Sequence, residues 1–300
     1  MLLIKFALYR EGIALMASLL KCSIFFIISK IRNMSKDHQN YFSTNKETWN
    51  KKVAIHAASD FYDMKGFMSG KSSLNSYELD ALGDVAGKSL LHLQCHFGQD
   101  TLSWARMGAL CTGVDISDEA ITLSRKLNKE LNLSAKFVCC NVLDTNSYVQ
   151  EKFDIVFTSY GVIGWLPDLK PWAQVIADCL EVGGEFYMVE FHPIVWMFDY
   201  TKAQPEMRYG YAQEEVIYEE YEGTYAQEDA QMVSKEYGWN HGLGEVVTAL
   251  AGAGLQIQYM REHDGAPYDV LPDLVKNENG LYVSKDRLYP LIFEIKAVKI

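Results

Sequence analysis

From residue 88 to the C-terminus, short apolar runs alternate with segments in which apolar residues recur every three or four positions. The apolar runs predict strands over 90–94, 110–116, 135–142, 153–160, 185–191, 255–262 and 289–299. The periodic segments predict helices over 101–108, 117–131, 169–180 and 243–254. Such alternation is typical of βαβ units, so it predicts an α/β fold with a doubly wound, mostly parallel sheet of seven strands.

The pattern also suggests how the chain is organised. Residues 34–87 predict an N-terminal helical cap, and residues 88–300 form the main domain. The alternation breaks at 193–240, an insertion after the fifth strand in which residues 209–234 include seven acids, five tyrosines and no lysine or arginine. Alternating side chains over 215–225 predict a hairpin there. A lid over a substrate pocket, a contact in a homodimer and a solvated surface excursion are all open interpretations.

The first 33 residues differ from the rest, because the apolar run over 13–31 is broken only by Lys21 and Lys30. Crossing a membrane takes about 20 apolar residues, so a membrane anchor is one interpretation. A signal peptide is a weaker one, since no clear small-residue cleavage site follows the apolar core. We favour a third, in which Met34 is the native start and residues 1–33 are translated upstream sequence. A membrane partner is expected only if residues 1–33 are native.

Composition narrows the classes of protein. Hydrophobic residues make up 49% of the 300 residues and charged residues 22%, which is typical of a globular chain with a substantial core. The net charge of −11 disfavours a nucleic-acid partner, because phosphate contacts need clustered Lys and Arg. None of the six cysteines forms a C-x-x-C pair or has metal-ligand spacing with the seven histidines. We therefore expect a reduced, cytoplasmic protein without a metal centre.

In an open α/β sheet, ligands bind beyond the carboxyl ends of the strands, so the residues directly after each strand are the candidate site. Asp115 ends the second predicted strand, where a carboxylate can accept two hydrogen bonds from a ribose diol. The alternative is that it only caps the helix that DISDEA would begin. The preceding loop and the continuing alternation favour the nucleotide-type interpretation. The residues predicted to bind a cofactor are Gln94, Cys95, His96, Phe97, Gly98, Asp115, Ile116, Asn141, Val142, Ser159 and Tyr160.

Residues 88–190 resemble class I S-adenosylmethionine-dependent methyltransferases. The first motif of that family reads apolar-apolar-acidic-apolar-Gly-x-Gly-x-Gly, and it stands here as LLHLQCHFG, which ends at Gly98. The match continues, in order, with VDIS, NVLD, FDIVFTSYGVIGW and LEVGGEFYMVE. With WLPDL and EFHP, the chain is similar to a small-molecule subgroup whose substrates are often unassigned. The resemblance implies a Rossmann-like methyltransferase fold, S-adenosylmethionine as cofactor, and methyl transfer to an oxygen, nitrogen or sulfur atom of a small acceptor.

The first motif departs from the family pattern at three positions. Gln94 and His96 replace two glycines, so the loop backbone is expected to be less free to take positive φ. Their side chains are expected to contact the methionine end of the cofactor instead. His92 takes the position of the acidic residue, so direct recognition of the cofactor's amino group from this position is expected to be lost. We expect His92 to be a packed histidine near the strand.

A general base is needed only if the acceptor carries a proton that must leave. The candidates are His192, Glu190 and His241, and a structural role explains each of them equally well. Two other functions stay open. One is a nicotinamide-dependent oxidoreductase, against which the missing G-x-G-x-x-G argues, and the other is a non-catalytic cofactor-binding protein on the same fold.

An aromatic wall is predicted for the acceptor. Trp49, Tyr62 and Trp165, together with Tyr160, could surround a cationic methyl group or an apolar acceptor. The alternative is that these rings belong to the core.

Overall fold

The computed structural model describes residues 38–199, 206–272, 274–286 and 288–300. Residues 1–33, with their three interpretations, lie outside the described residues. Within the described ranges, no helix combines the length and the apolar character that crossing a membrane requires. The chain divides into two compact units, Met1–Ser43 and Thr44–Ile300. Only helical residues 38–43 of the first unit are described, and everything below concerns the second.

Seven strands of the second unit form one sheet in the order β3-β2-β1-β4-β5-β12-β8. Neighbouring strands are parallel except at β12, which runs antiparallel to both β5 and β8. The predicted α/β fold with a mostly parallel seven-stranded sheet is therefore confirmed. The strands are β1 (Ser89–Leu93), β2 (Leu110–Asp115), β3 (Lys136–Cys139), β4 (Phe153–Ser159), β5 (Leu180–Phe191), β8 (Leu255–His263) and β12 (Ile292–Lys299).

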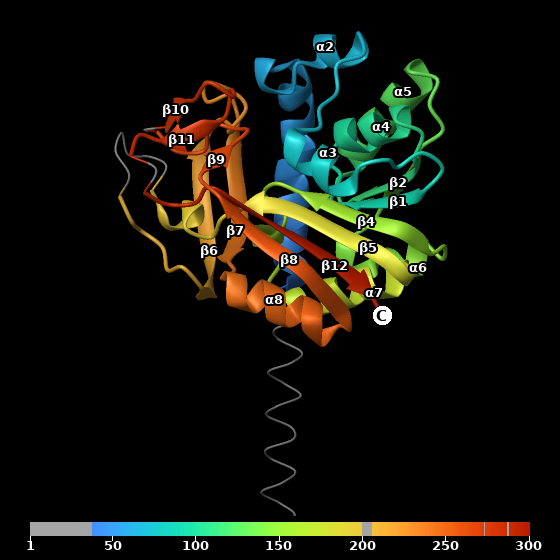
Figure 1. Ribbon diagram of the computed structural model, residues 1–300. Coiled ribbons are helices and arrows are strands. Elements are labelled where there is room, and N and C mark those ends of the chain that lie inside the picture. The colour runs from blue at the N-terminus through green and yellow to red at the C-terminus, as the bar shows by residue number, and fades with distance from the viewer. Residues whose placement is uncertain (1–37, 200–205, 273, 287) are drawn as a thin grey trace, which may run out of the picture. The chain divides into compact units, whose positions relative to one another are not determined.

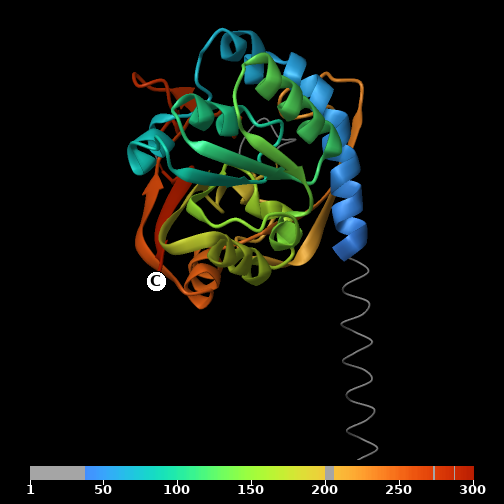
Figure 2. The same ribbon diagram turned by 90° about the vertical axis from the view of Figure 1, so that its right-hand side faces the viewer.

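Helices cover both faces of this sheet, with α4 and α5 on one face and α6, α7 and α8 on the other (Figures 1 and 2). Ser117 caps α5 by accepting a hydrogen bond from the amide of Ala120, as predicted. Trp172 and Ile176 lie on one stripe of α7 and are fully buried, so that stripe packs into the core. The helices are α4 (Gln99–Arg106), α5 (Asp118–Glu130), α6 (Thr145–Tyr148), α7 (Leu169–Cys179) and α8 (Leu243–Gly252).

Short helical elements surround the strand ends. Helical residues 44–58 precede the sheet and carry no label in Figure 1. The shorter elements are η1 (Asp60–Tyr62), α2 (Met64–Met68), α3 (Ser76–Leu82), η2 (Val142–Asp144), η3 (Ile163–Trp165) and η4 (Val195–Met197).

The insertion forms the predicted hairpin, in which β6 (Gln213–Glu222) pairs with β7 (Val233–Asn240). Helical residues 44–58 pack along β7. The Asn45 side chain exchanges two hydrogen bonds of 2.8 Å with the backbone of Tyr237, and Thr48 Oγ1 donates to the carbonyl of Lys235 at 2.7 Å. Lys52, only 1% exposed, forms an ion pair with Glu236. The helix and the hairpin are therefore joined by buried polar contacts.

Two features differ from the prediction. β5 begins at Leu180, so Gly183 and Gly184 lie inside the strand instead of before it. The pairing of β4 with β5 shifts register there, and a Cβ on Gly184 would lie 2.9 Å from the carbonyl oxygen of Glu181. The glycines therefore permit an irregular strand start. A small sheet of β9 (Gly265–Ala266), β10 (Leu274–Lys276) and β11 (Tyr282–Ser284) was not predicted, because its strands are only two or three residues long.

Candidate active site

The register of the sheet brings the predicted cofactor residues to one edge. Extending the observed pairing of β1 by one or two residues puts Gln94 between Asp115 and Ser159. Asp115 in turn pairs with Cys139, two residues before Asn141. Four parallel strands thus end side by side, at the edge where open α/β sheets bind ligands.

The loop between β1 and α4 has the backbone shape of a glycine-rich loop with only one glycine. The φ angles are 57° at Gln94, 49° at His96 and 81° at Gly98, all in the left-handed region. The expectation that Gln94 and His96 would limit positive φ is therefore wrong. A Cβ costs roughly 1–2 kcal/mol in this conformation, and two contacts help to offset that cost. Gln94 Nε2 donates to the carbonyl of Val162 at 2.8 Å, and His96 Nε2 lies 3.2 Å from Nδ1 of His56.

Gly98 is required by its backbone conformation and also by its neighbours. A Cβ at this position would lie 2.6 Å from a ring carbon of Phe137. Gly113 on β2 faces the same ring, since a Cβ there would lie 2.9 Å from both Phe137 and Sγ of Cys95. The ring of Phe137 fills the space beneath the loop, so the loop backbone lies close to β2 and β3.

Asp115 holds the loop at the end of β2. Its Oδ2 accepts a hydrogen bond from the amide of His96, and its Oδ1 accepts one from the amide of Ser117, both at 2.8 Å. Burial raises the pKa of Asp115 to about 6, although these amides act in the opposite direction. Its side chain is partly exposed, and each carboxylate oxygen can accept a second hydrogen bond. The helix-start and ribose interpretations are therefore compatible.

The remaining predicted cofactor residues differ in accessibility. Cys95, Phe97, Val142 and Ser159 are buried and support the site from behind. The Asn141 side chain accepts a hydrogen bond from the amide of Leu143. The predicted residues with surface available to a ligand are Gln94, His96, Asp115, Ile116, Asn141 and Tyr160.

Three buried polar atoms around the loop have no hydrogen-bond partner among the described residues: Oε1 of Gln94, Nδ1 of His96 and Nε2 of His56. Burial lowers the pKa of His56 to about 3 and that of His96 well below its usual value, so both rings are neutral. One ring donates to the other across 3.2 Å, and the pair therefore leaves one N–H donor and one bare nitrogen. Unpaired buried polar atoms are costly, and such atoms fit a site that a polar cofactor completes.

Three of the four rings predicted for the acceptor lie in one cluster beside His96, whereas Tyr160 packs elsewhere, against Phe191 and Tyr268. The ring centre of Trp49 lies 5.1 Å from that of His96 and 5.4 Å from that of Trp165, and Tyr62 lies 5.6 Å from His96. Tyr225, from the turn between β6 and β7, joins them through a hydrogen bond between its hydroxyl and that of Tyr62. Four separate segments of the chain thus contribute to one aromatic cluster.

Two of the three predicted bases have both ring nitrogens engaged. His241 Nε2 donates to the carbonyl of Leu166 at 2.7 Å, and its Nδ1 lies 3.0 Å from Glu245. His192 Nδ1 accepts a hydrogen bond from the amide of Ile194, and its Nε2 lies 2.9 Å from a carboxylate oxygen of Glu262. These contacts indicate structural roles for His241 and His192.

Glu190, the third predicted base, has no exposed surface. Its carboxylate accepts hydrogen bonds from the amides of Gly161, Val162 and Ile163. Burial raises its pKa, and these amides oppose the rise. Glu190 thus anchors the chain that follows β4, the same chain to which Gln94 is bonded.

His92 is packed, as expected. Its Nδ1 lies 2.9 Å from the hydroxyl of Thr101, and its ring packs against Phe157 with ring centres 4.7 Å apart. Burial lowers its pKa to about 3, so the ring is neutral. His92 therefore brings no negative charge to the loop.

Two carboxyl groups at the strand ends escaped the sequence prediction. Asp100, in the first turn of α4, accepts hydrogen bonds from the hydroxyls of Ser73 at 2.7 Å and Ser159 at 3.2 Å. Glu78 of α3 is fully buried and accepts one from the hydroxyl of Tyr160 at 3.3 Å. Burial raises the pKa of Asp100, and it raises that of Glu78 to about 7. Asp100 could have been found from its place two residues after Gly98, whereas Glu78 carried no such signal.

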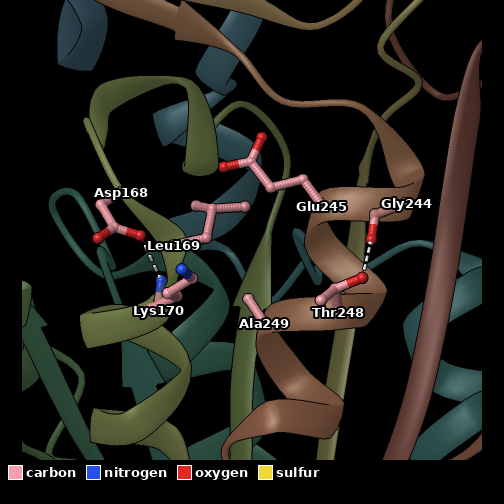
Figure 3. Close-up of a pocket in the computed structure, with 7 residues that line it drawn as sticks. All are labelled: Asp168, Leu169, Lys170, Gly244, Glu245, Thr248 and Ala249. Atoms are coloured by element: carbon pink, nitrogen blue, oxygen red, sulfur yellow. Dashed lines mark hydrogen bonds between the residues drawn. The ribbon is translucent and has the colours of Figure 1, made fainter.

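Figure 3 shows a surface pocket between the beginnings of α7 and α8. Asp168, Lys170, Glu245 and Thr248 contribute to its lining. The Asp168 side chain caps α7, and Thr248 donates to the carbonyl of Gly244, so these polar groups serve their own helices. None of the candidate cofactor residues lines this pocket, which makes it a surface feature apart from the strand-end site.

The strand order, the strained loop after β1 and the acid after β2 together define a Rossmann-like methyltransferase fold. Residues 91–188 match the family model described as a methyltransferase domain. Residues 91–188 are therefore similar to a methyltransferase domain, and the resemblance of this part of the sequence to class I S-adenosylmethionine-dependent methyltransferases is confirmed.

Among curated proteins, a ubiquinone biosynthesis O-methyltransferase from Aeromonas salmonicida (strain A449) is 26% identical over 135 residues. The match covers 44% of this chain and 56% of that protein, so the chain spans little more than half the length of this relative. The similarity therefore concerns the matched 135 residues.

Two solved structures share the fold. An S-adenosylmethionine-dependent methyltransferase from Listeria monocytogenes has a TM-score of 0.54 at 19% identity, covering 75% of this chain and 96% of that one. Geranyl diphosphate C-methyltransferase from Streptomyces coelicolor, solved with S-adenosylhomocysteine, has a TM-score of 0.51 at 14% identity, covering 87% and 98%. At these identities the likeness concerns the fold.

Proposed function

We propose that this protein transfers a methyl group from S-adenosylmethionine to an oxygen, nitrogen or sulfur atom of a small molecule. The observation that carries the proposal is the strained loop after β1, which Asp115 holds and which carries unpartnered buried atoms of Gln94 and His96. Strain of this kind is concentrated at binding sites. The match to a methyltransferase domain over the same residues supports it.

S-adenosylmethionine supplies, when bound, a methyl group made electrophilic by a sulfonium sulfur. On the protein side, we assign the ribose hydroxyls to the carboxylate of Asp115. Ile116 and Asn141 follow β2 and β3 and would flank the base, with the buried Val142 behind them, while Gln94 and His96 would face the methionine end.

Methyl transfer is an in-line displacement, so the protein contributes mainly by positioning the acceptor and excluding water. The aromatic cluster of Trp49, Tyr62, Trp165 and Tyr225 is the proposed acceptor wall. We propose that the hairpin acts as a lid, because β7 is fastened to helical residues 44–58 and Tyr225 reaches into the cluster. A contact in a homodimer remains a prediction for its outer surface.

Where the acceptor must lose a proton, we propose that the pair of His56 and His96 receives it. The pair is neutral and has a bare nitrogen in either tautomer, whereas both nitrogens of His192 and His241 are engaged. Because burial lowers the pKa of His56 to about 3, the pair would take the proton once the forming methyl bond has made the acceptor strongly acidic. Glu190 is committed to four backbone amides, those of Gly161, Val162, Ile163 and Phe191. We therefore assign structural roles to those three residues.

The acceptor class follows from charge and from the curated relatives. A chain with a net charge of −11 is a poor partner for nucleic acid, which favours a small molecule. The relatives named for O-methylation in ubiquinone biosynthesis support an oxygen acceptor. A cytoplasmic location accords with the free cysteines of the described region.

The experiment that tests the proposal measures release of S-adenosylhomocysteine from S-adenosylmethionine with a panel of phenols, amines and thiols. We expect acceptor-dependent release, highest with a hydroxyl acceptor. A protein that binds the cofactor and turns over no acceptor would favour the non-catalytic alternative. A melting temperature raised by a nicotinamide cofactor and unaffected by S-adenosylmethionine would favour an oxidoreductase.

A further inference from the structure

The carboxylate of Asp100 lacks a counter-charge. Its two oxygens accept hydrogen bonds from the hydroxyls of Ser73 and Ser159, and no lysine, arginine or histidine pairs with it in the described part of the chain. Hydroxyl donors favour the ionised form, whereas burial opposes it. A partly buried carboxylate with neutral partners alone is an attractive site for a cation.

An acceptor without a partner belongs to the same part of the site. Oε1 of Gln94 is buried without a partner, while Nε2 of the same side chain is bonded to Val162. Asp100 is bonded to Ser159, so both side chains are tied to residues 159–162 after β4. Glu190 anchors that segment through the amides of residues 161–163. Both side chains are thus bonded to one segment of the chain, residues 159–162, which Glu190 anchors.

The usual source of negative charge is absent from β1. His92 stands at the acidic position of the family motif, and it is neutral and bonded to Thr101. It cannot balance a positively charged group at the loop. Asp100, two residues after Gly98, is the first acidic residue that follows the loop in the sequence.

We propose that Asp100, assisted by Oε1 of Gln94, binds the ammonium group at the methionine end of the cofactor. The inference rests on the proposed function, because it takes S-adenosylmethionine as the ligand. The carboxylate supplies the charge, and the amide oxygen accepts a second N–H bond. Asp100 is therefore a specificity-determining residue for the cofactor, and it takes no part in the proton transfer of the acceptor.

The test is a calorimetric titration of the full chain with two ligands, S-adenosylhomocysteine and its deaminated analogue, which keeps the carboxylate. A hydrogen bond to a charged group contributes enough that the wild type should prefer S-adenosylhomocysteine roughly 10- to 100-fold. Asp100→Asn, which keeps the shape of the side chain, should bring the two affinities to within about 3-fold of each other. Gln94→Met should reduce the preference by a smaller factor.

Asp115→Asn serves as the matched control, because Asp115 faces the ribose that both ligands share. Asp115→Asn should weaken the binding of both ligands by a similar factor and leave the ratio of their affinities unchanged. A preference that survives in Asp100→Asn, or a wild type that binds both ligands equally, would overturn the inference while leaving the proposed function intact.

Failure of the proposed function gives a different result, in which the folded wild type binds neither ligand, and the inference then falls with it. If Asp100→Asn binds neither ligand, Gln94→Met decides. A reduced preference in Gln94→Met supports the ammonium site, and an unchanged preference overturns it.

Discussion

Replacing Gly98 with alanine perturbs the loop in two separable ways. The residue has a φ of 81°, where a Cβ is strained, and the added carbon would lie 2.6 Å from the ring of Phe137. A contact that short forces the loop or the ring to move, because real Cβ atoms do not approach other carbons so closely.

The expected loss of stability follows from these two effects. The left-handed conformation costs roughly 1–2 kcal/mol for a residue with a Cβ. Overpacking against a buried ring adds about 1–3 kcal/mol. Gly98→Ala should therefore lower the free energy of unfolding by about 2–5 kcal/mol. Gly98→Ala should also weaken the binding of S-adenosylhomocysteine, because the loop is the proposed cofactor site.

Two other glycines isolate the contributions. Gly87 has a φ of 77° and no atom within 4 Å of an added Cβ, so Gly87→Ala measures strain alone, about 1 kcal/mol. Gly113 has no positive φ, yet its added Cβ would lie 2.9 Å from Phe137, so Gly113→Ala measures crowding alone. Urea unfolding of the three variants gives the comparison. A Gly98→Ala variant no less stable than Gly87→Ala would refute the reasoning about the packed loop.

Three further predictions test the surrounding structure. Lys52→Met leaves Glu236 without its buried partner and should lower the free energy of unfolding in urea by about 3–5 kcal/mol. The double variant with Glu236→Gln should recover part of this loss. An unchanged unfolding midpoint in Lys52→Met would show that the ion pair between the helix and the hairpin does not contribute to stability. Burial raises the pKa of Glu78 from 4.5 to about 7, so its ionisation destabilises the folded protein as pH rises through that interval. The free energy of unfolding of Glu78→Gln relative to that of the wild type should therefore rise by roughly 3 kcal/mol between pH 4 and pH 8. A difference that does not change with pH would contradict this account. His56→Gln should lower kcat for a hydroxyl acceptor and alter the pH profile of kcat, measured at saturating S-adenosylmethionine; an unaltered kcat would exclude the proposed proton acceptor.

The parts of this fold that follow local rules were predictable from sequence. Apolar runs located the seven strands of the main sheet to within a few residues, and Ser117 marked the start of α5 through ordinary capping chemistry. Parallel strands end at a common edge, and this rule alone predicts that Gln94, Asp115 and Ser159 lie together.

The parts that depend on distant contacts were not predictable. His56 and Glu78 lie on helices outside the βα pattern, and only in the folded chain does His56 meet the loop and Glu78 meet Tyr160 after β4. The positive φ of Gln94 and His96 is held by Val162 and His56, so residue type alone gave the wrong answer.

The predicted bases show the same limit. Being at a strand end does not decide where a side chain points, and Glu190 turns toward the backbone amides of residues 161–163. Its position in the sequence was that of a candidate base, whereas its contacts are those of an anchor. Only the three-dimensional arrangement distinguishes the two.

The most direct test of the central claim is a calorimetric titration of the protein with S-adenosylhomocysteine, compared with an Asp115→Ala variant. Asp115 alone links the loop amide of His96 to the proposed ribose position. We predict that the wild type binds the ligand and that binding is lost in the variant, with the fold checked by circular dichroism. A folded wild type that does not bind S-adenosylhomocysteine would show that the strained loop is not a cofactor site.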